Sequence, residues 1–194
     1  FRGVSVSEIK FAGNKLTKVG DGAFYGCSNI ESITFNEGLT EIGDNAFWNC
    51  SKLEIINLPS TISEIGDNIL WRCEALQQVN VAEGCSTFSA YDGVLYENDE
   101  DGNPSVLILC PVNNSGNEGT VTVPNTVIEV KDQAFSNNKG IVNIIFEDYT
   151  QDFIDANNSL TLGSGNISSD IFYNTEKLEY IKLPRGIEVI QPYS

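Results

Sequence analysis

The sequence predicts an α/β solenoid, a coil of similar short turns stacked along one axis. The phrase "LTKVGDGAFYGCSN" at 16–29 returns as "LTEIGDNAFWNCSK" at 39–52, and three of its positions recur at the same interval in a third copy (39 − 16 = 23 and 62 − 39 = 23). A fixed period between about 20 and 30 residues is typical of solenoids, whose turns cannot bury their apolar faces alone. Each of the three positions is occupied once per copy: the first by Leu16, Leu39 and Ile62, the second by Phe24, Phe47 and Leu70, and the third by Cys27, Cys50 and Cys73.

The same template predicts where the turns of the coil lie. It resumes at Val127 and again in "GNISSDIFYNTEKLEYIKLP", where Phe172 takes the aromatic position. We expect one solenoid domain over 1–194, because a chain of 194 residues is long enough to bury a core. The expected segments are repeats at about 1–15, 16–38, 39–61, 62–84, 120–146 and 164–194, a hairpin insert at 85–119 and an irregular stretch at 147–163.

The second half of each unit predicts a short strand. It reads "IESITF", "LEIINL", "LQQVNV", "IVNIIF" and "LEYIKL", each an apolar-x-x-apolar-x-apolar hexamer. This is the core pattern of leucine-rich repeats, in which the last three residues alternate between the core and the outside. We therefore expect a right-handed solenoid with short parallel strands on its concave face, spaced about 4.8 Å apart.

The first half of each unit predicts one short helical turn on the other side of the solenoid. In "LTEIGDNAFWNC" the glycine permits a bend, the aspartate is a helix N-cap, and the following residues turn the phenylalanine inward. The aspartates form a column, Asp21, Asp44, Asp67 and Asp132. Such a column either caps the turns by accepting backbone N–H bonds or binds cations.

Taken together, these residues resemble the BspA-like group of leucine-rich repeats. The segment "IGDNAFWNCSKLEIINLP" carries the group's Ile-Gly-x-x-Ala-Phe-x-x-Cys core and its Leu-x-x-Ile-x-Leu-Pro strand. Residues 88–111 resemble a recurrent insert of the group, a hairpin with "GVLY" and "VLILC" as strands. The resemblance implies a secreted or cell-surface adhesion protein, and some members bind host proteins such as fibronectin and fibrinogen.

The cysteines have two interpretations. Five cysteines cannot all pair within one chain. Cys27, Cys50 and Cys73 share one repeat position, where Asn138 and Thr175 stand in later units, so we expect a column of buried thiols acting as small apolar fillers. A disulfide between Cys85 and Cys110, which flank the hairpin, is left open.

Composition excludes several classes of function. Eleven Lys and Arg against 27 Asp and Glu leave a net charge of −16, which repels nucleic acid. Histidine is absent, so catalytic triads and histidine-ligated zinc are excluded within this chain. The acidic turn at 97–103 has loop spacing for calcium, but Ile108 stands where the bidentate Glu should be. No apolar run reaches the roughly 20 residues of a membrane span.

Three surfaces are candidates for binding, and one of them is the hairpin at 88–111. The position after the inward phenylalanine is aromatic in four units, and aligned Trp and Tyr either pack on the next turn or form a contact surface. These aromatic residues are Tyr25, Trp48, Trp71 and Tyr173. The outward positions of the strands are mostly polar and suit an extended polypeptide or a glycan; they are Ser32, Thr34, Ile55, Asn57, Gln78, Asn80, Thr120, Thr122, Asn143, Ile145, Tyr180 and Lys182.

The sequence therefore predicts a binding protein and no enzyme. We expect a monomeric, secreted or cell-surface module without cofactor, metal or transmembrane segment, whose repeat surface engages a protein such as an extracellular-matrix component. Two alternatives stay open: glycan binding through the aromatic residues, and a structural spacer in a longer repeat array. A carboxylate-based hydrolase would need two carboxylates about 5–10 Å apart in a pocket, whereas a solenoid offers open surfaces. Because the chain begins with Phe1, we also expect it to be a processed product or a piece of a longer protein.

Overall fold

The computed structural model describes residues 1–11, 13, 15–114, 116–155, 159–163, 170–185 and 187. They fall into two compact units, Phe1–Ala90 and Tyr91–Ser194. The predicted continuity of one domain over 1–194 stays a prediction.

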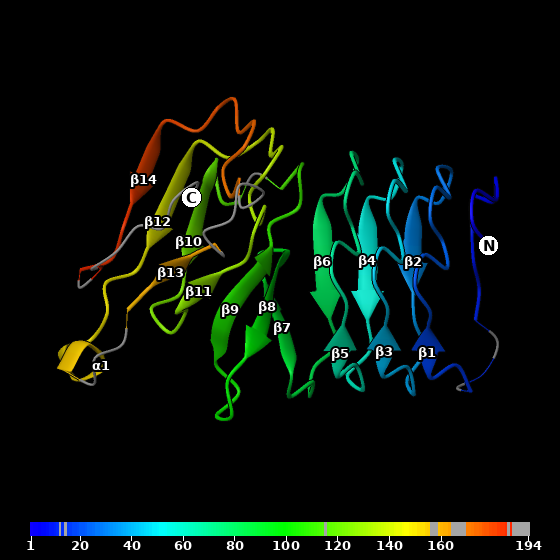
Figure 1. Cartoon of the computed structure of the whole chain (residues 1–194), viewed down its shortest axis with the longest axis horizontal. Coiled ribbons are helices and arrows are strands. Elements are labelled where there is room, and N and C mark those ends of the chain that lie inside the picture. The colour runs from blue at the N-terminus through cyan, green and yellow to red at the C-terminus, as the bar shows by residue number, and fades with distance from the viewer. Residues whose placement is uncertain are drawn as a thin grey trace. The chain divides into compact units, whose positions relative to one another are not determined.

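The first unit contains two parallel three-stranded sheets, which Figure 1 shows as two rows of arrows. One sheet has the order β2-β4-β6 and the other β1-β3-β5. In both sheets the register advances by one repeat from strand to strand, as in Ile33 beside Ile56 and Ile56 beside Val79. Residues one repeat period apart in the sequence are therefore paired in neighbouring strands. The strands are β1 (Lys18–Val19), β2 (Ser32–Thr34), β3 (Glu41–Ile42), β4 (Ile55–Leu58), β5 (Glu64–Ile65) and β6 (Gln78–Val81).

Equivalent side chains of successive turns form the core of the first unit. The ring centroids of Phe24 and Phe47 lie 5.3 Å apart with the planes only 6° from parallel, and Phe35 lies 5.9 Å from Phe47. Leu39 and Ile62 are buried, as the periodicity predicted. Each turn thus buries its apolar face against the next one, which is the packing expected of a solenoid.

The predicted short helical turns are absent from the described repeats, and this prediction was wrong. Two residues of each turn, four positions apart, adopt left-handed backbone angles, for example Asn45 (φ 54°) and Asn49 (φ 59°). An α-helix cannot contain such residues in its interior. The segment instead consists of successive tight turns. The same two positions are left-handed in five copies: Gly22 and Gly26, Asn45 and Asn49, Asn68 and Arg72, Gln133 and Asn137, and Asp170 and Asn174.

Hydrogen bonding explains why the chain prefers tight turns here. The N–H groups along the segment alternate between two kinds of acceptor. Tyr25 N–H bonds within its own turn to Gly22 O at 3.0 Å, whereas Phe24 N–H bonds to Ala46 O of the next repeat at 2.8 Å. A helix would direct every N–H along its own axis, so it would leave the neighbouring repeat's carbonyls without these donors.

The aspartate column bonds between repeats instead of capping helices. Asp21 Oδ1 accepts the N–H of Asp44 at 3.1 Å, and Asp44 Oδ1 accepts the N–H of Asp67 at 2.8 Å. The predicted capture of backbone N–H groups is confirmed for these residues, but the donor lies one repeat further along. Since the carboxylates of Asp21, Asp44 and Asp67 are exposed, water screens their mutual repulsion.

The second unit repeats this arrangement with an inserted hairpin. β10, β12 and β14 form one parallel sheet, while β11 pairs in parallel with β9 and β13. β8 pairs antiparallel with β9, as expected of the insert, and its turn is closed by Asp99 Oδ1, which accepts from Asp101 and Asn103 N–H. The chain enters this unit within β7 (Phe88–Tyr91). The strands are β8 (Val94–Asn98), β9 (Pro104–Leu109), β10 (Thr120–Val123), β11 (Glu129–Val130), β12 (Asn143–Phe146), β13 (Thr161–Leu162) and β14 (Tyr180–Lys182).

The stretch predicted to be irregular lengthens the last turn. Thr120 lies beside Asn143, an interval of 143 − 120 = 23, but Asn143 lies beside Tyr180, an interval of 180 − 143 = 37. The last turn is therefore longer than a regular repeat by 37 − 23 = 14, and the added segment includes α1 (Gln151–Asp155). Part of the repeat predicted at 164–194 lies outside the described residues. Within the described part of the chain, no helix is long and apolar enough to cross a membrane.

The glycines of the Ile-Gly-Asp phrase give a sharp test of this packing. They do not adopt left-handed angles, so the bend predicted from the sequence is not their role. A Cβ added at Gly43 would collide with Asp21 Oδ1 and lie 2.8 Å from Asp21 N, whereas one added at Gly20 would meet no atom within 4 Å. The glycine is needed for close approach to the preceding repeat.

We expect Gly43→Ala to lower the free energy of unfolding by about 1–3 kcal/mol, because the added methyl group pushes two repeats apart. Urea denaturation followed by circular dichroism measures it. Gly20→Ala is the matched control and should change stability by less than about 0.5 kcal/mol. Equal losses in both variants would contradict the close-approach explanation.

Candidate binding surface

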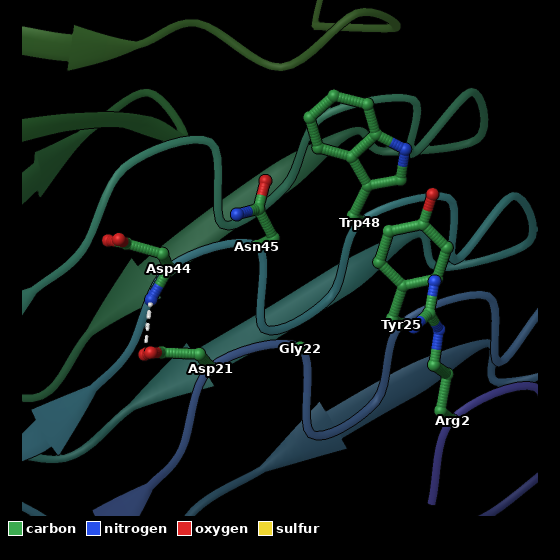
Figure 2. A pocket seen from close by; sticks show the side chains of 7 residues that line it. All are labelled: Arg2, Asp21, Gly22, Tyr25, Asp44, Asn45 and Trp48. Carbon is green, nitrogen blue, oxygen red and sulfur yellow. Dashed lines mark hydrogen bonds between the residues drawn. The ribbon is translucent and has the colours of Figure 1, made fainter.

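A ladder of three aromatic side chains, Tyr25, Trp48 and Trp71, runs along the turn segments of the first unit. The ring centroids of Tyr25 and Trp48 lie 6.1 Å apart with the planes 5° from parallel, and those of Trp48 and Trp71 lie 6.0 Å apart at 49°. All three side chains are partly exposed. Figure 2 shows the rings of Tyr25 and Trp48 side by side. These three residues are called the aromatic ladder below.

Inter-repeat hydrogen bonds hold the aromatic ladder in place. Gly26 N–H donates to Trp48 O at 2.7 Å, and Asn49 N–H donates to Trp71 O at 2.7 Å. The residue before each ladder position points inward, so the ladder residue itself turns to the surface. The spacing of the rings is therefore set by the backbone and depends little on the side chains' own freedom.

Arg2 extends the aromatic ladder by one position. It precedes Tyr25 by one repeat period (25 − 2 = 23), just as Phe1 precedes Phe24, and the Phe1 and Phe24 rings lie 5.5 Å apart and nearly parallel. The guanidinium carbon of Arg2 lies 4.4 Å from the Tyr25 ring centroid, a cation–π contact. The sequence prediction gives a repeat at about 1–15 but assigns no ladder position within it, so it does not include Arg2. The interval from Phe1 to Phe24, which equals the repeat period, is the signal that could have revealed it.

An open depression of about 450 Å³ lies beside this end of the ladder. It brings aromatic, acidic and amide groups together, as Figure 2 shows. The site combines flat apolar faces with negative charge and hydrogen-bonding capacity, all on one repeating surface. Its lining residues are Arg2, Asp21, Gly22, Tyr25, Asp44, Asn45 and Trp48.

Tyr173, the fourth predicted aromatic residue, belongs to the second unit. It is 60% exposed, and the Phe172 ring before it lies 5.6 Å from Phe135. The preceding turn carries buried Ser136 at the ladder position, so it offers no aromatic neighbour there. The structure therefore brings together three of the four predicted aromatic residues.

The outward positions of the strands are exposed or half-buried, as predicted, but their polar side chains bond to one another. Asn57 Nδ2 donates to Thr34 Oγ1 at 2.9 Å, and Asn80 Nδ2 donates to Asn57 Oδ1 at 2.8 Å. Gln78 Nε2 donates to Asn80 Oδ1 at 2.7 Å. Ser32 and Ile55 lie in the same sheet, beside each other in register. This surface is a row of mutually satisfied amides and hydroxyls.

In the second unit, too, outward-facing side chains of the strands form hydrogen bonds and ion pairs. Asn143 Nδ2 donates to Thr120 Oγ1 at 3.2 Å, and Lys182 forms an ion pair with Asp148 at 3.1 Å. Lys182 and the Arg185 N–H hold the pKa of the Asp148 carboxyl below its usual range. Thr122 and Tyr180 are exposed. Ile145 is half-buried.

The cysteine column is confirmed as a stack of free thiols. Cys27, Cys50 and Cys73 are buried, and each donates its S–H to a carbonyl 26 residues earlier, as Cys50 does to Phe24 O at 3.2 Å. Burial raises the pKa of the Cys50 thiol to about 12 and raises that of Cys73 as well. Cys85 and Cys110 are also free, so the disulfide left open by the sequence is not formed.

Asn138 shows how another residue replaces cysteine in this column. It is fully buried, yet its Nδ2 donates to Pro111 O and Asn114 O at 2.7 and 2.8 Å. Its Oδ1 accepts from the N–H groups of Gly140 and Ile141. The amide is completely satisfied, so this position requires a group that bonds a neighbouring carbonyl rather than sulfur itself.

A sequence profile described as the BspA type leucine-rich repeat region matches six copies over residues 1–92 and 113–194. The chain belongs to this family. The gap between the two matched ranges contains the β8–β9 hairpin, which agrees with an insert between repeats. No curated protein matches the chain closely enough to count as a relative.

Two solved structures share the fold of this BspA-type chain. One is a leucine-rich cell surface protein from Faecalibacterium prausnitzii, with 25% identity and a TM-score of 0.67 over 88% of this chain. The other is the pneumococcal vaccine antigen PcpA, with 26% identity and a TM-score of 0.68 over 90% of this chain. This chain covers 40% and 39% of those two chains, respectively.

The thiol column predicts selective labelling. Because the thiolate is the reactive form, the buried cysteines with raised pKa should not react in the folded protein. We expect DTNB at pH 8 to modify only the half-exposed Cys85 in buffer and all five cysteines in urea. Cys85→Ser should abolish the native reaction, and rapid labelling of Cys50 in buffer would contradict the buried column.

Proposed function

We propose that this chain is a non-enzymatic binding module of a secreted or cell-surface protein, which engages a partner protein through the aromatic ladder. The observation that carries the proposal is the alignment of Tyr25, Trp48 and Trp71 on one exposed flank beside an open depression. Trp and Tyr dominate binding energy where they are held rigidly at a surface, because little entropy is lost when they are covered.

Comparison with the sheet surface favours the ladder. The polar side chains of Thr34, Asn57 and Asn80 already form hydrogen bonds with one another. A partner would have to replace these hydrogen bonds, so its net gain per contact would be small. The ring atoms of the ladder have no such bonds to lose, and covering them removes apolar area from water at about 25 cal/mol per Å².

The family and the structural neighbours support the location in which this chain would meet its partner. A cell surface protein and a vaccine antigen share the fold of this BspA-type chain, which supports an exposed location for it. A protein of the extracellular matrix is the partner class we propose. The chain covers about two fifths of those structures, so the activity of the complete protein is part of this proposal.

Glycan binding is the second candidate, and one observation favours it. The nearly parallel rings of Tyr25 and Trp48 lie beside Asp44 and Asn45, so flat faces and hydrogen-bonding groups occur in one depression. Sugar rings use both kinds of contact. A glycan array of the purified chain would separate the two candidates, because a protein adhesin should leave it blank.

The proposal predicts that Trp48→Ala and Trp71→Ala each weaken binding to immobilised fibronectin or fibrinogen by about 30-fold, since a central Trp contributes roughly 2 kcal/mol or more. Biolayer interferometry measures the affinity, and circular dichroism with urea titration confirms the fold. Gln78→Ala on the sheet surface is the control and should bind normally. If the wild-type chain bound neither fibronectin nor fibrinogen nor any glycan, the result would favour the structural spacer instead.

A further inference from the structure

Resting on the proposed function, we propose that the aromatic ladder recognises cationic side chains. The ligand is an extended basic segment of the partner protein, whose arginine or lysine side chains sit on successive rungs. Three independent features lead to this chemistry: a cation already placed on the ladder, carboxylates that follow the ladder, and the distance between rungs.

The first feature is the contact made by Arg2. This residue occupies the ladder position one repeat before Tyr25, and its guanidinium covers the Tyr25 ring at 4.4 Å. The same group lines the depression with Asp21 and Asp44 (Figure 2). The chain itself thus shows that a ring of this ladder holds a cation. The equivalent place over Trp48 is taken by the Tyr25 ring, so an external cation would contact the part of Trp48 that lines the depression, and Trp is the most favourable ring for this contact.

The second feature is the column of carboxylates beside the ladder. Asp21, Asp44 and Asp67 are exposed and recur in the same register as Tyr25, Trp48 and Trp71. Asp21 and Asp44 each accept one backbone N–H through Oδ1, which fixes the carboxylate while most of its acceptor capacity remains for a ligand.

Charge complementarity extends beyond the depression. A net charge of −16 attracts a basic segment and repels an acidic one. Two other cations of the first unit, Lys18 and Arg72, bear on where a ligand cation would bind. Lys18 is paired with Glu41, while Arg72 is exposed next to Trp71, so the strongest cation site should lie at Trp48.

The third feature is the spacing of the rungs. Successive ring centroids are 6.1 and 6.0 Å apart. In an extended peptide, side chains on one side recur at about 6.6 Å, twice the rise of one residue. A segment with basic residues at alternate positions can therefore place one cation on each rung when it runs along the ladder.

The direct test uses a fluorescein-labelled Arg-Thr-Arg-Thr-Arg-Thr-Arg peptide and the same peptide with citrulline for arginine. Citrulline keeps the shape and removes the charge. We expect fluorescence anisotropy to show that the arginine peptide binds and that added salt weakens this binding. Each arginine replaced by citrulline should remove one cation–π contact and weaken binding by roughly 2- to 30-fold. Equal affinity for the two peptides would overturn the proposal.

Three variants and one control variant locate the site. Trp48→Ala should weaken peptide binding, and so should Asp44→Asn, which keeps an oxygen to accept the Asp67 N–H. Glu83→Gln changes the charge equally at an exposed residue outside the depression, and it should bind like wild type. Arg2→Ala should tighten binding, because it uncovers Tyr25 and removes a competing cation. If Glu83→Gln weakened peptide binding as much as Asp44→Asn does, the effect would come from net charge alone, and the proposed site would be wrong.

The test separates failure of this inference from failure of the proposed function. If fibronectin or fibrinogen binds in a Trp48-dependent way while the arginine peptide does not bind, the ladder is a protein-binding surface and the cationic ligand is wrong. If neutral oligosaccharides bind in a Trp48-dependent way and the peptide does not, the ladder is a glycan site. If Trp48→Ala changes no binding at all, both proposals fail.

Discussion

Backbone hydrogen bonds between successive repeats are the interaction on which the rest of this structure depends. They occur in the short parallel sheets, where Ile33 lies beside Ile56, and in the turn segments, where Phe24 N–H donates to Ala46 O. Both sets keep the register of one repeat. A repeat that lost this register would leave its buried N–H and C=O groups without partners, at about 1–3 kcal/mol for each group. The left-handed turns, the close-approach glycines and the buried thiol column all follow from keeping it.

Because of this register, a residue type that recurs at one repeat position forms a continuous surface or core column. Any residue type that recurs once per repeat becomes a column, whether it is Phe24 and Phe47 inside or Tyr25 and Trp48 outside. Inside, the column fills the core with parallel rings. Outside, it produces a regular series of contacts whose spacing is set by the backbone. Binding capacity in the first unit is therefore a property of the stack, since an isolated repeat would present only one ring and one carboxylate.

The parts that sequence reasoning predicted correctly depend on periodicity. The inward phenylalanines, the free buried thiols and the parallel strands follow from a repeated pattern of apolar residues and need no knowledge of side-chain orientation. The helical turn was wrong because "GDNAF" has a capping aspartate and helix-tolerant residues, and these features do not reveal the left-handed angles of Asn45 and Asn49. Asparagine and glycine four positions apart predict tight turns, and this signal is present at 22 and 26 and again at 45 and 49. Arg2 was missed because a partial first repeat has no assigned ladder position.

Periodicity in the sequence is enough to establish the repeat length, the family and the residues of each column, because each depends only on which residues recur at a fixed interval. The tertiary structure decided what each column does. It gave the aspartates a backbone N–H from the next repeat, linked the sheet amides to one another, and placed the Arg2 guanidinium on Tyr25 beside two carboxylates. These contacts join residues of different repeats through particular atoms, and spacing along the chain does not specify which atoms meet.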